Sequence, residues 1–195
     1  MENCFACAQL CSGAGRKAAL ALCLAFCMLG LGLSVNAEQG EAGIITFDVG
    51  GAGTGAYQGT SPYGVNPAGA ITGEFFDASG VAPGYLRAPD GSITPFDAPG
   101  AGSVADSFHG TYPTSINPSG WISGFIVDDG GVYHGFVRAP DGKLTPFDCP
   151  AKYQGTQSGQ GTVPMSNNLA GAITGYCIDT NGAFHGFLWT PSIRR

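Results

Sequence analysis

The sequence predicts an all-β fold built from three copies of a 51-residue unit. The first observation is self-similarity, because Asn66, Asn117 and Asn168 lie 51 residues apart and each begins an Asn-x-x-Gly turn. The second is composition, because 33 Gly and 13 Pro residues with 11% charged residues favour short strands joined by tight turns. The third is that no helical periodicity extends over ten residues after residue 37.

The first 37 residues are predicted to be a secretory signal peptide. Arg16 and Lys17 precede an apolar run over residues 18–33, and a cleavage site follows that ends in Ala37. The run is shorter than the roughly 20 residues that span a bilayer as a helix, so we expect no permanent membrane anchor. A retained N-terminal anchor is the alternative. The protein is therefore expected to be secreted or periplasmic, with one β-repeat domain over residues 38–195.

Removal of this leader leaves two of the seven cysteines, Cys149 and Cys177. In an oxidising compartment they can form one disulfide, and the alternative is two small buried hydrophobic side chains. The leader residues Cys4 and Cys7 resemble half of a zinc site, but no further ligand follows at metal-binding spacing. We expect neither a metal nor a cofactor.

Each unit is predicted to contain four short strands. Asn-Pro-Ser-Gly, Asp-Asp-Gly-Gly and Pro-Asp-Gly segments supply the turns, where Gly adopts positive φ and Asn or Asp bonds its own backbone. The units span residues 58–97, 109–148 and 160–190. In the middle unit the strands are expected at about 111–116, 121–127, 132–138 and 143–148.

An extra strand precedes the first unit. Residues 44–48 read Ile-Ile-Thr-Phe-Asp and match the fourth strand at 93–97, whereas the third unit has no such strand after Thr190. We therefore expect residues 44–48 to pair antiparallel with the strand at 184–189 and close a β-propeller-like ring. Because three units are fewer than the four to eight blades of ordinary propellers, a three-fold β-trefoil-like barrel is the alternative.

The Thr-Pro-Phe-Asp, Asn-x-x-Gly and His-Gly-Phe motifs resemble the repeats of the bacterial HAF family of extracellular repeat proteins. The resemblance covers residues 44–190. It is most specific at 173–176 and 185–188, and weaker in the first unit, where Pro83 replaces the His. It implies an extracellular repeat architecture with a variable number of units, which suits propeller blades better than a trefoil. It implies no particular activity or ligand.

No catalytic constellation is predicted. His134 and His185 are equivalent positions, and a residue that recurs with the fold is usually structural. Asp48, Asp97 and Asp148 each follow a Phe at a strand end, and ring closure would bring them to one rim. A hydrolase that uses these rim carboxylates is therefore the less favoured alternative. Nucleophile elbows, phosphate loops and His-Glu-x-x-His motifs do not occur in the sequence.

We expect a non-enzymatic extracellular binding or interaction module, with a carbohydrate-binding domain as the narrower alternative. The net charge of −6 disfavours nucleic acid, so the expected partner is a carbohydrate or a protein. Aromatic residues in or beside the loops are the candidate binding residues, because their ring faces stack on sugars or apolar groups. The alternative is that they cap the core. These residues are Tyr57, Tyr63, Tyr112, Trp121 and Tyr153, with Phe108 beside them.

Overall fold

The computed structural model describes residues 43–191, and its main compact unit begins at Thr46. The described residues contain eleven strands and one short 3-10 helix, and no α-helix. The all-β prediction is therefore confirmed. No helix in this part of the chain is long and apolar enough to cross a membrane. The predicted signal peptide, with its cysteines, lies outside the described residues.

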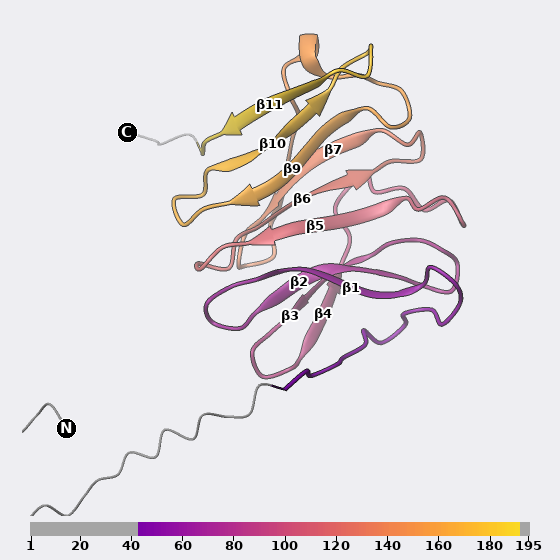
Figure 1. Cartoon of the computed structure of the whole chain (residues 1–195), viewed down its shortest axis with the longest axis vertical. Coiled ribbons are helices and arrows are strands. Elements are labelled where there is room, and N and C mark those ends of the chain that lie inside the picture. The colour runs from indigo at the N-terminus through magenta and orange to yellow at the C-terminus, as the bar shows by residue number, and fades with distance from the viewer. Residues whose placement is uncertain (1–42, 192–195) are drawn as a thin grey trace, which may run out of the picture. The chain divides into compact units, whose positions relative to one another are not determined.

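The strands follow one another as three similar antiparallel units (Figure 1). The first unit holds β1 (Gly59–Val65), β2 (Ile71–Phe76), β3 (Gly84–Arg87) and β4 (Ile93–Phe96). The second holds β5 (Gly110–Ile116), β6 (Ile122–Val127), β7 (Tyr133–Arg138) and β8 (Leu144–Phe147). The 3-10 helix η1 (Ala151–Tyr153) leads to β9 (Gly161–Asn167), β10 (Ile173–Ile178) and β11 (Phe184–Trp189). The four strands predicted for the middle unit are confirmed to within about two residues.

Neighbouring units are joined at the edges of their sheets. The second and third units share one parallel bridge between Tyr133 and Gly161, and the first two units have the equivalent bridge between Ala82 and Gly110. The first strands of the units, β1, β5 and β9, consequently lie next to one another. The sheets formed by the described strands are not closed into a barrel or a propeller.

The hydrophobic core lies between units. Phe96 and Ala98, at and after the end of the first unit, pack with Ile122 and Phe136 of the second unit. The rings of Phe96 and Phe136 meet edge to face with their centroids 6.3 Å apart. One unit earlier, the rings of Phe47 and Tyr85 meet in the same way at 6.1 Å. Each unit therefore covers the apolar face of the next.

Ring closure by residues 44–48 within one chain is wrong. These residues form no strand, and the described chain shows no pairing between them and β11. Phe47 and Val49 instead join Phe75 and Tyr85 in an apolar cluster on the first unit. The physical reason is that this segment already has an apolar face to cover at the first unit, so the outer edge of β11 stays open. Barrel closure, the trefoil alternative, fails for the same reason.

Cys149 and Cys177 form a disulfide with their Cα atoms 6.1 Å apart. Both residues are buried. The equivalent positions 51 residues earlier are taken by Ala98 and Ile126, which belong to one apolar cluster. The disulfide therefore replaces an apolar contact that the fold makes in each unit.

Candidate functional site

A β-bulge recurs in the first strand of every unit, between that strand and the second. The register shifts between Pro62 and Gly64 in β1, and at the equivalent places in β5 and β9. The residue left without a partner is Tyr63, Thr114 or Met165. Bulges turn a side chain away from the regular alternation of a strand. Here all three bulged side chains line one hollow of about 360 Å³ between the units.

A glycine on the second strand makes each bulge possible. A Cβ atom added at Gly73, Gly124 or Gly175 would lie 2.0–2.3 Å from a backbone oxygen of the first strand. No side chain fits at such a distance. The Gly in the repeated Ile-Thr-Gly or Ile-Ser-Gly motif is thus required by the close approach of two strands at the site.

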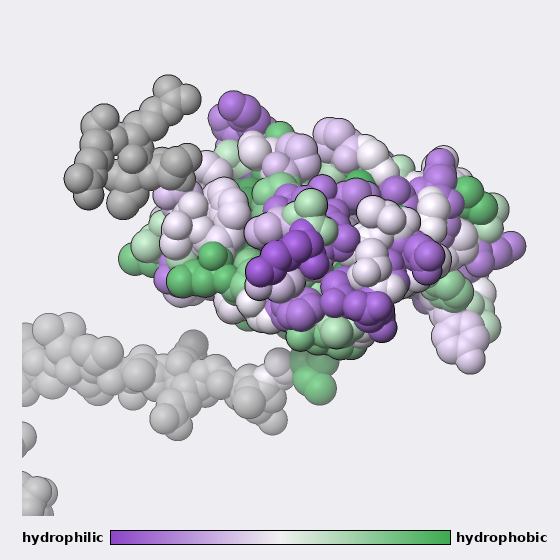
Figure 2. Space-filling view, turned by 90° about the horizontal axis from the view of Figure 1, so that it is seen from above, coloured by the Kyte–Doolittle hydropathy of each residue, from purple (hydrophilic) through white to green (hydrophobic). Residues whose placement is uncertain are grey.

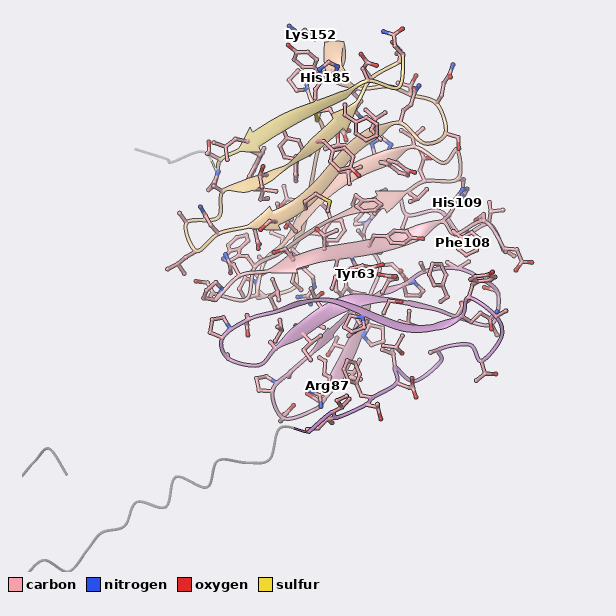
Figure 3. The ribbon with its side chains drawn as sticks, viewed as in Figure 1. Tyr63, Arg87, Phe108, His109, Lys152 and His185 are labelled. Carbon is pink, nitrogen blue, oxygen red and sulfur yellow. A yellow bond between two sulfur atoms is a disulfide. The ribbon has the colours of Figure 1, made fainter. Side chains whose placement is uncertain are left out.

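The hollow continues into a second one of about 410 Å³, and together we call them the aromatic groove. Both hollows are lined by Tyr112, Phe125, Val163 and Tyr176. Tyr112 stacks on Phe125 with their ring centroids 5.1 Å apart and an interplanar angle of 6°. Tyr63 stands 59% exposed at the rim, on the face where β1 and β5 meet (Figure 3). The groove therefore combines a half-buried aromatic floor with an accessible ring.

One carboxyl group lies beside the groove, on β2. Glu74 is 2% exposed, and the Tyr63 hydroxyl donates a hydrogen bond to its Oε1 atom over 3.1 Å. Its Oε2 atom has no hydrogen-bond partner. Burial raises the pKa of Glu74 to about 7, against which the hydrogen bond from Tyr63 acts only in part. The pKa of Tyr63 is raised as well, first by its own burial and then by the neighbouring carboxylate.

The residues that form the groove differ from unit to unit, although the backbone repeats. The position of Glu74 is taken by Phe125 and Tyr176 in the later units, and that of Tyr112 by Ser61 and Val163. A role in the fold alone would favour the same residue type in each unit. In the groove, therefore, the three units share the same backbone conformation but carry different side chains.

The structure brings two of the five predicted binding residues together, Tyr63 and Tyr112. The other three lie elsewhere in the array. Tyr57 lies in the loop before β1 beside Phe108, and Trp121 lies in a hollow with Trp189 at the turns. Tyr153, in η1, packs against His185 with ring centroids 4.7 Å apart.

Sequence reasoning missed three groove residues, Phe125, Met165 and Tyr176, and it missed Glu74 beside the groove. They lie within strands, whereas the prediction looked for aromatic rings in loops. A signal existed, because these are positions at which three aligned units carry chemically different residues. A comparison of the three units for positions that vary, as well as for positions that are identical, would have selected them.

A separate hollow of about 270 Å³ adjoins His134 in the second unit. The imidazole lies between Asp128, at 3.4 Å, and Asp148, at 3.1 Å. His185 repeats the first of these contacts with Asp179 at 3.1 Å. Asp128 and Asp179 also accept backbone hydrogen bonds in their own turns. These bonds lower the pKa of Asp179, and they lower the pKa of Asp128 against the opposing effect of its partial burial. This arrangement holds the hairpins together.

Within residues 43–191, no three His, Cys, Asp or Glu side chains gather at metal-binding distance. Asp48, Asp97 and Asp148 belong to no such group, and the ring closure that would bring them to one rim is not observed among the described strands. Comparison with protein-family models, with curated proteins and with solved structures finds no match for this chain. Function must therefore be argued from the groove itself.

Proposed function

We propose that this chain is a secreted, non-enzymatic binding module that takes up carbohydrate in the aromatic groove. The observation that carries the proposal is the convergence of Tyr63, Tyr112 and Tyr176 from three different units on one groove. Flat rings with a polar hydroxyl suit sugars, because the ring packs on C–H groups while the hydroxyl bonds to a sugar oxygen. Glu74 adds one polar group beside the groove, and the bulge at Met165 adds an adaptable apolar one.

The compartment and the architecture belong to the same proposal. A buried disulfide between Cys149 and Cys177 is typical of proteins in an oxidising environment, which supports export. We interpret the three units as propeller-type blades of the kind that the HAF-like motifs imply, with β1, β5 and β9 as the innermost strands. Small-ligand sites are concave and mostly apolar with a few polar groups, and the groove between these units has that character.

A binding role is favoured over hydrolysis by the chemistry of the lining. Glycoside hydrolases use two carboxyl groups on opposite sides of the scissile bond. Neither hollow of the groove is lined by a pair of carboxyl groups. Glu74 is held by the hydroxyl of Tyr63, so it is suited to accept or donate one hydrogen bond.

Affinity electrophoresis of the protein in gels that contain soluble xylan, β-glucan, glucomannan or glycogen tests the proposal. We expect at least one polysaccharide to retard the protein. Tyr63→Thr and Tyr112→Val should each weaken binding about tenfold or more, which corresponds to about 1.4 kcal/mol. Both substitutions introduce the residue that another unit carries at the same position, Thr114 or Val163, so the fold is expected to accept them.

Tyr153→Ala is the matched control, because Tyr153 is an aromatic residue outside the groove. It should leave the retardation unchanged. Migration of the wild-type protein unaffected by every polysaccharide, or equal losses in the control, would contradict carbohydrate binding in the groove. Release of reducing sugar from any of the polysaccharides would instead assign an enzyme.

A further inference from the structure

We propose that the open edge of β11 binds residues 44–48 of a second copy of this chain, so that two copies complete each other's third unit. The proposal rests on the repeat and does not depend on what the groove binds. Six units would then form the assembly, a number within the four to eight blades that close ordinary propellers.

The segment around Phe47 already makes one half of a contact between units. The Phe47 ring meets Tyr85 at 6.1 Å, and the guanidinium of Arg87 lies 4.9 Å from its centre. One unit later, Phe96 makes the same contacts with Phe136 at 6.3 Å and Arg138 at 4.8 Å. Phe47 is thus placed like a residue of a fourth strand, but no described strand pairs with its backbone.

The backbone that follows repeats this agreement. The amide of Val49 donates to Thr60 Oγ1 over 3.0 Å, as Ala98 donates to Thr111 over 3.0 Å. Where a complete unit precedes, this hydrogen bond follows a fourth strand that is paired with its own third strand. Residues 47–49 therefore contact the first unit as the end of a preceding unit would. No other described strand of this chain belongs to such a preceding unit.

The edge of β11 shows the complementary deficit. Leu188 is 72% exposed, whereas its equivalent Val137, in β7, which is paired with β8, is 7% exposed. Gly186 has open space around it, whereas a Cβ at Gly135 would lie 3.0 Å from the Phe147 ring of the fourth strand. Among the described strands, none pairs with this outer edge of β11. The edge thus keeps the glycine that makes room for a fourth-strand Phe.

The pairing of β7 with β8 fixes the register. Gly135 lies opposite Phe147 and Val137 opposite Thr145. By the repeat, Gly186 of one copy lies opposite Phe47 of the other, and Leu188 opposite Ile45. In the second unit, His134 contacts Asp148, the residue that follows Phe147. In the same register Asp48 of the second copy meets His185.

A second copy is the occupant because one chain cannot place this segment at both ends of the array. Phe47 is held on Tyr85 in the first unit, while β11 is the outermost strand of the third unit, at the far end of the array (Figure 1). Ile45 and Thr46 are exposed and lie outside the described strands. Seen from the β11 end, hydrophilic residues predominate and hydrophobic residues are scattered among them (Figure 2).

Light scattering after size-exclusion chromatography tests this on protein expressed from the full sequence. We expect twice the mass of one chain at micromolar concentration. Leu188→Arg should weaken self-association about 100-fold or more, because a charge on an edge strand opposes pairing. Leu169→Arg, at an equally exposed leucine in a turn, should leave the mass unchanged. A monomeric wild type, or a mass above that of two chains, would overturn the proposal.

Cysteine cross-linking tests the register. Separately purified Ile45→Cys and Leu188→Cys proteins, mixed and oxidised, should give a disulfide-linked species of two chains. Ile45→Cys with Leu86→Cys is the control and should give none, because Leu86 is already paired with Thr94 of β4. A double Ile45→Cys/Leu188→Cys variant that forms its disulfide within one chain would show closure inside the monomer and contradict strand exchange.

Discussion

The side-chain amide of Asn66 donates a hydrogen bond to the backbone carbonyl of Asn117, 3.2 Å away and 51 residues further along the chain. Asn117 repeats the contact with Asn168 at 2.9 Å. The same side chains accept hydrogen bonds from their own turns. One residue type thus shapes each turn and also connects it to the next unit.

Asn117→Ala should destabilise the protein by about 2–3 kcal/mol, because three partly buried hydrogen bonds to backbone groups are lost together. Asn117 is 1% exposed, and its Oδ1 atom accepts from the amides of Ser119 and Trp121. Asn168→Ala is the control, since the Asn168 turn is exposed and should lose less. Urea unfolding measures both. Equal losses would show that the contact between units contributes nothing.

Reduction of the disulfide should lower the free energy of unfolding by about 3–4 kcal/mol, the range for a closed loop of this length. The variant Cys149→Ala/Cys177→Ile introduces the pair found 51 residues earlier, Ala98 and Ile126. It should be insensitive to reductant and more stable than the reduced wild type, because the Ala and Ile side chains restore the apolar contact that Ala98 and Ile126 make. Thermal unfolding with and without dithiothreitol measures this. A variant no more stable than the reduced protein would contradict the equivalence of the pairs.

Glu74 should make stability fall as the pH rises from about 4.5 to about 7. Its pKa is raised from 4.5 to about 7 in the folded state, so within this window the native protein holds a proton that the unfolded chain has released. The total loss is on the order of 3 kcal/mol, and stability should level off above the folded pKa.

Glu74→Gln keeps an acceptor for Tyr63 and should remove this fall. Asp97, whose pKa is also raised mainly by burial, contributes equally to both proteins and cancels in the difference. Urea unfolding at pH 5, 6, 7 and 8 gives the comparison. Parallel curves for the two proteins would show that Glu74 titrates in the folded state as in the unfolded one.

Gly124→Ala should be among the most destabilising single substitutions, by about 3 kcal/mol or more, because the new Cβ would lie 2.3 Å from the carbonyl oxygen of Tyr112. The backbone of β5 would have to move and the bulge at Thr114 would be lost. Gly186→Ala, on the open edge of β11, is the control. It should leave the melting temperature of the single chain unchanged, because nothing lies within 4 Å of the added Cβ. Circular dichroism during thermal unfolding compares the two. Similar melting temperatures would contradict a required bulge.

Much of the fold follows from local turn chemistry. The Asn-x-x-Gly turns place Gly120 and its equivalents at positive φ, and the strands on either side run antiparallel, as predicted. The spacing of 51 residues then fixes three like units. The pairing of residues 44–48 was predicted wrongly, because the match to a fourth strand identifies the kind of contact but not which unit supplies the partner.

The groove was predicted only in part. Tyr63 and Tyr112 were selected as aromatic residues near loops, although both lie within strands. The turn signals show where a strand begins and ends, but a bulge depends on a close approach between Gly73 and Ser61 that only the folded sheet displays. Glu74 escaped notice because nothing in a single strand indicates that its carboxyl is buried.

The bulged residue of each unit has no cross-strand partner. Its side chain can therefore change, and with it the ligand contacts of the unit, without a change in strand pairing. Tyr63, Thr114 and Met165 differ in size and polarity, yet the hydrogen bonds around them are laid out alike. An added unit would lengthen the groove by one more bulged residue, whose identity the fold does not restrict, and would leave the existing units unchanged. A chain of this kind can change its ligand by substitution at one position per unit, and its reach by duplication.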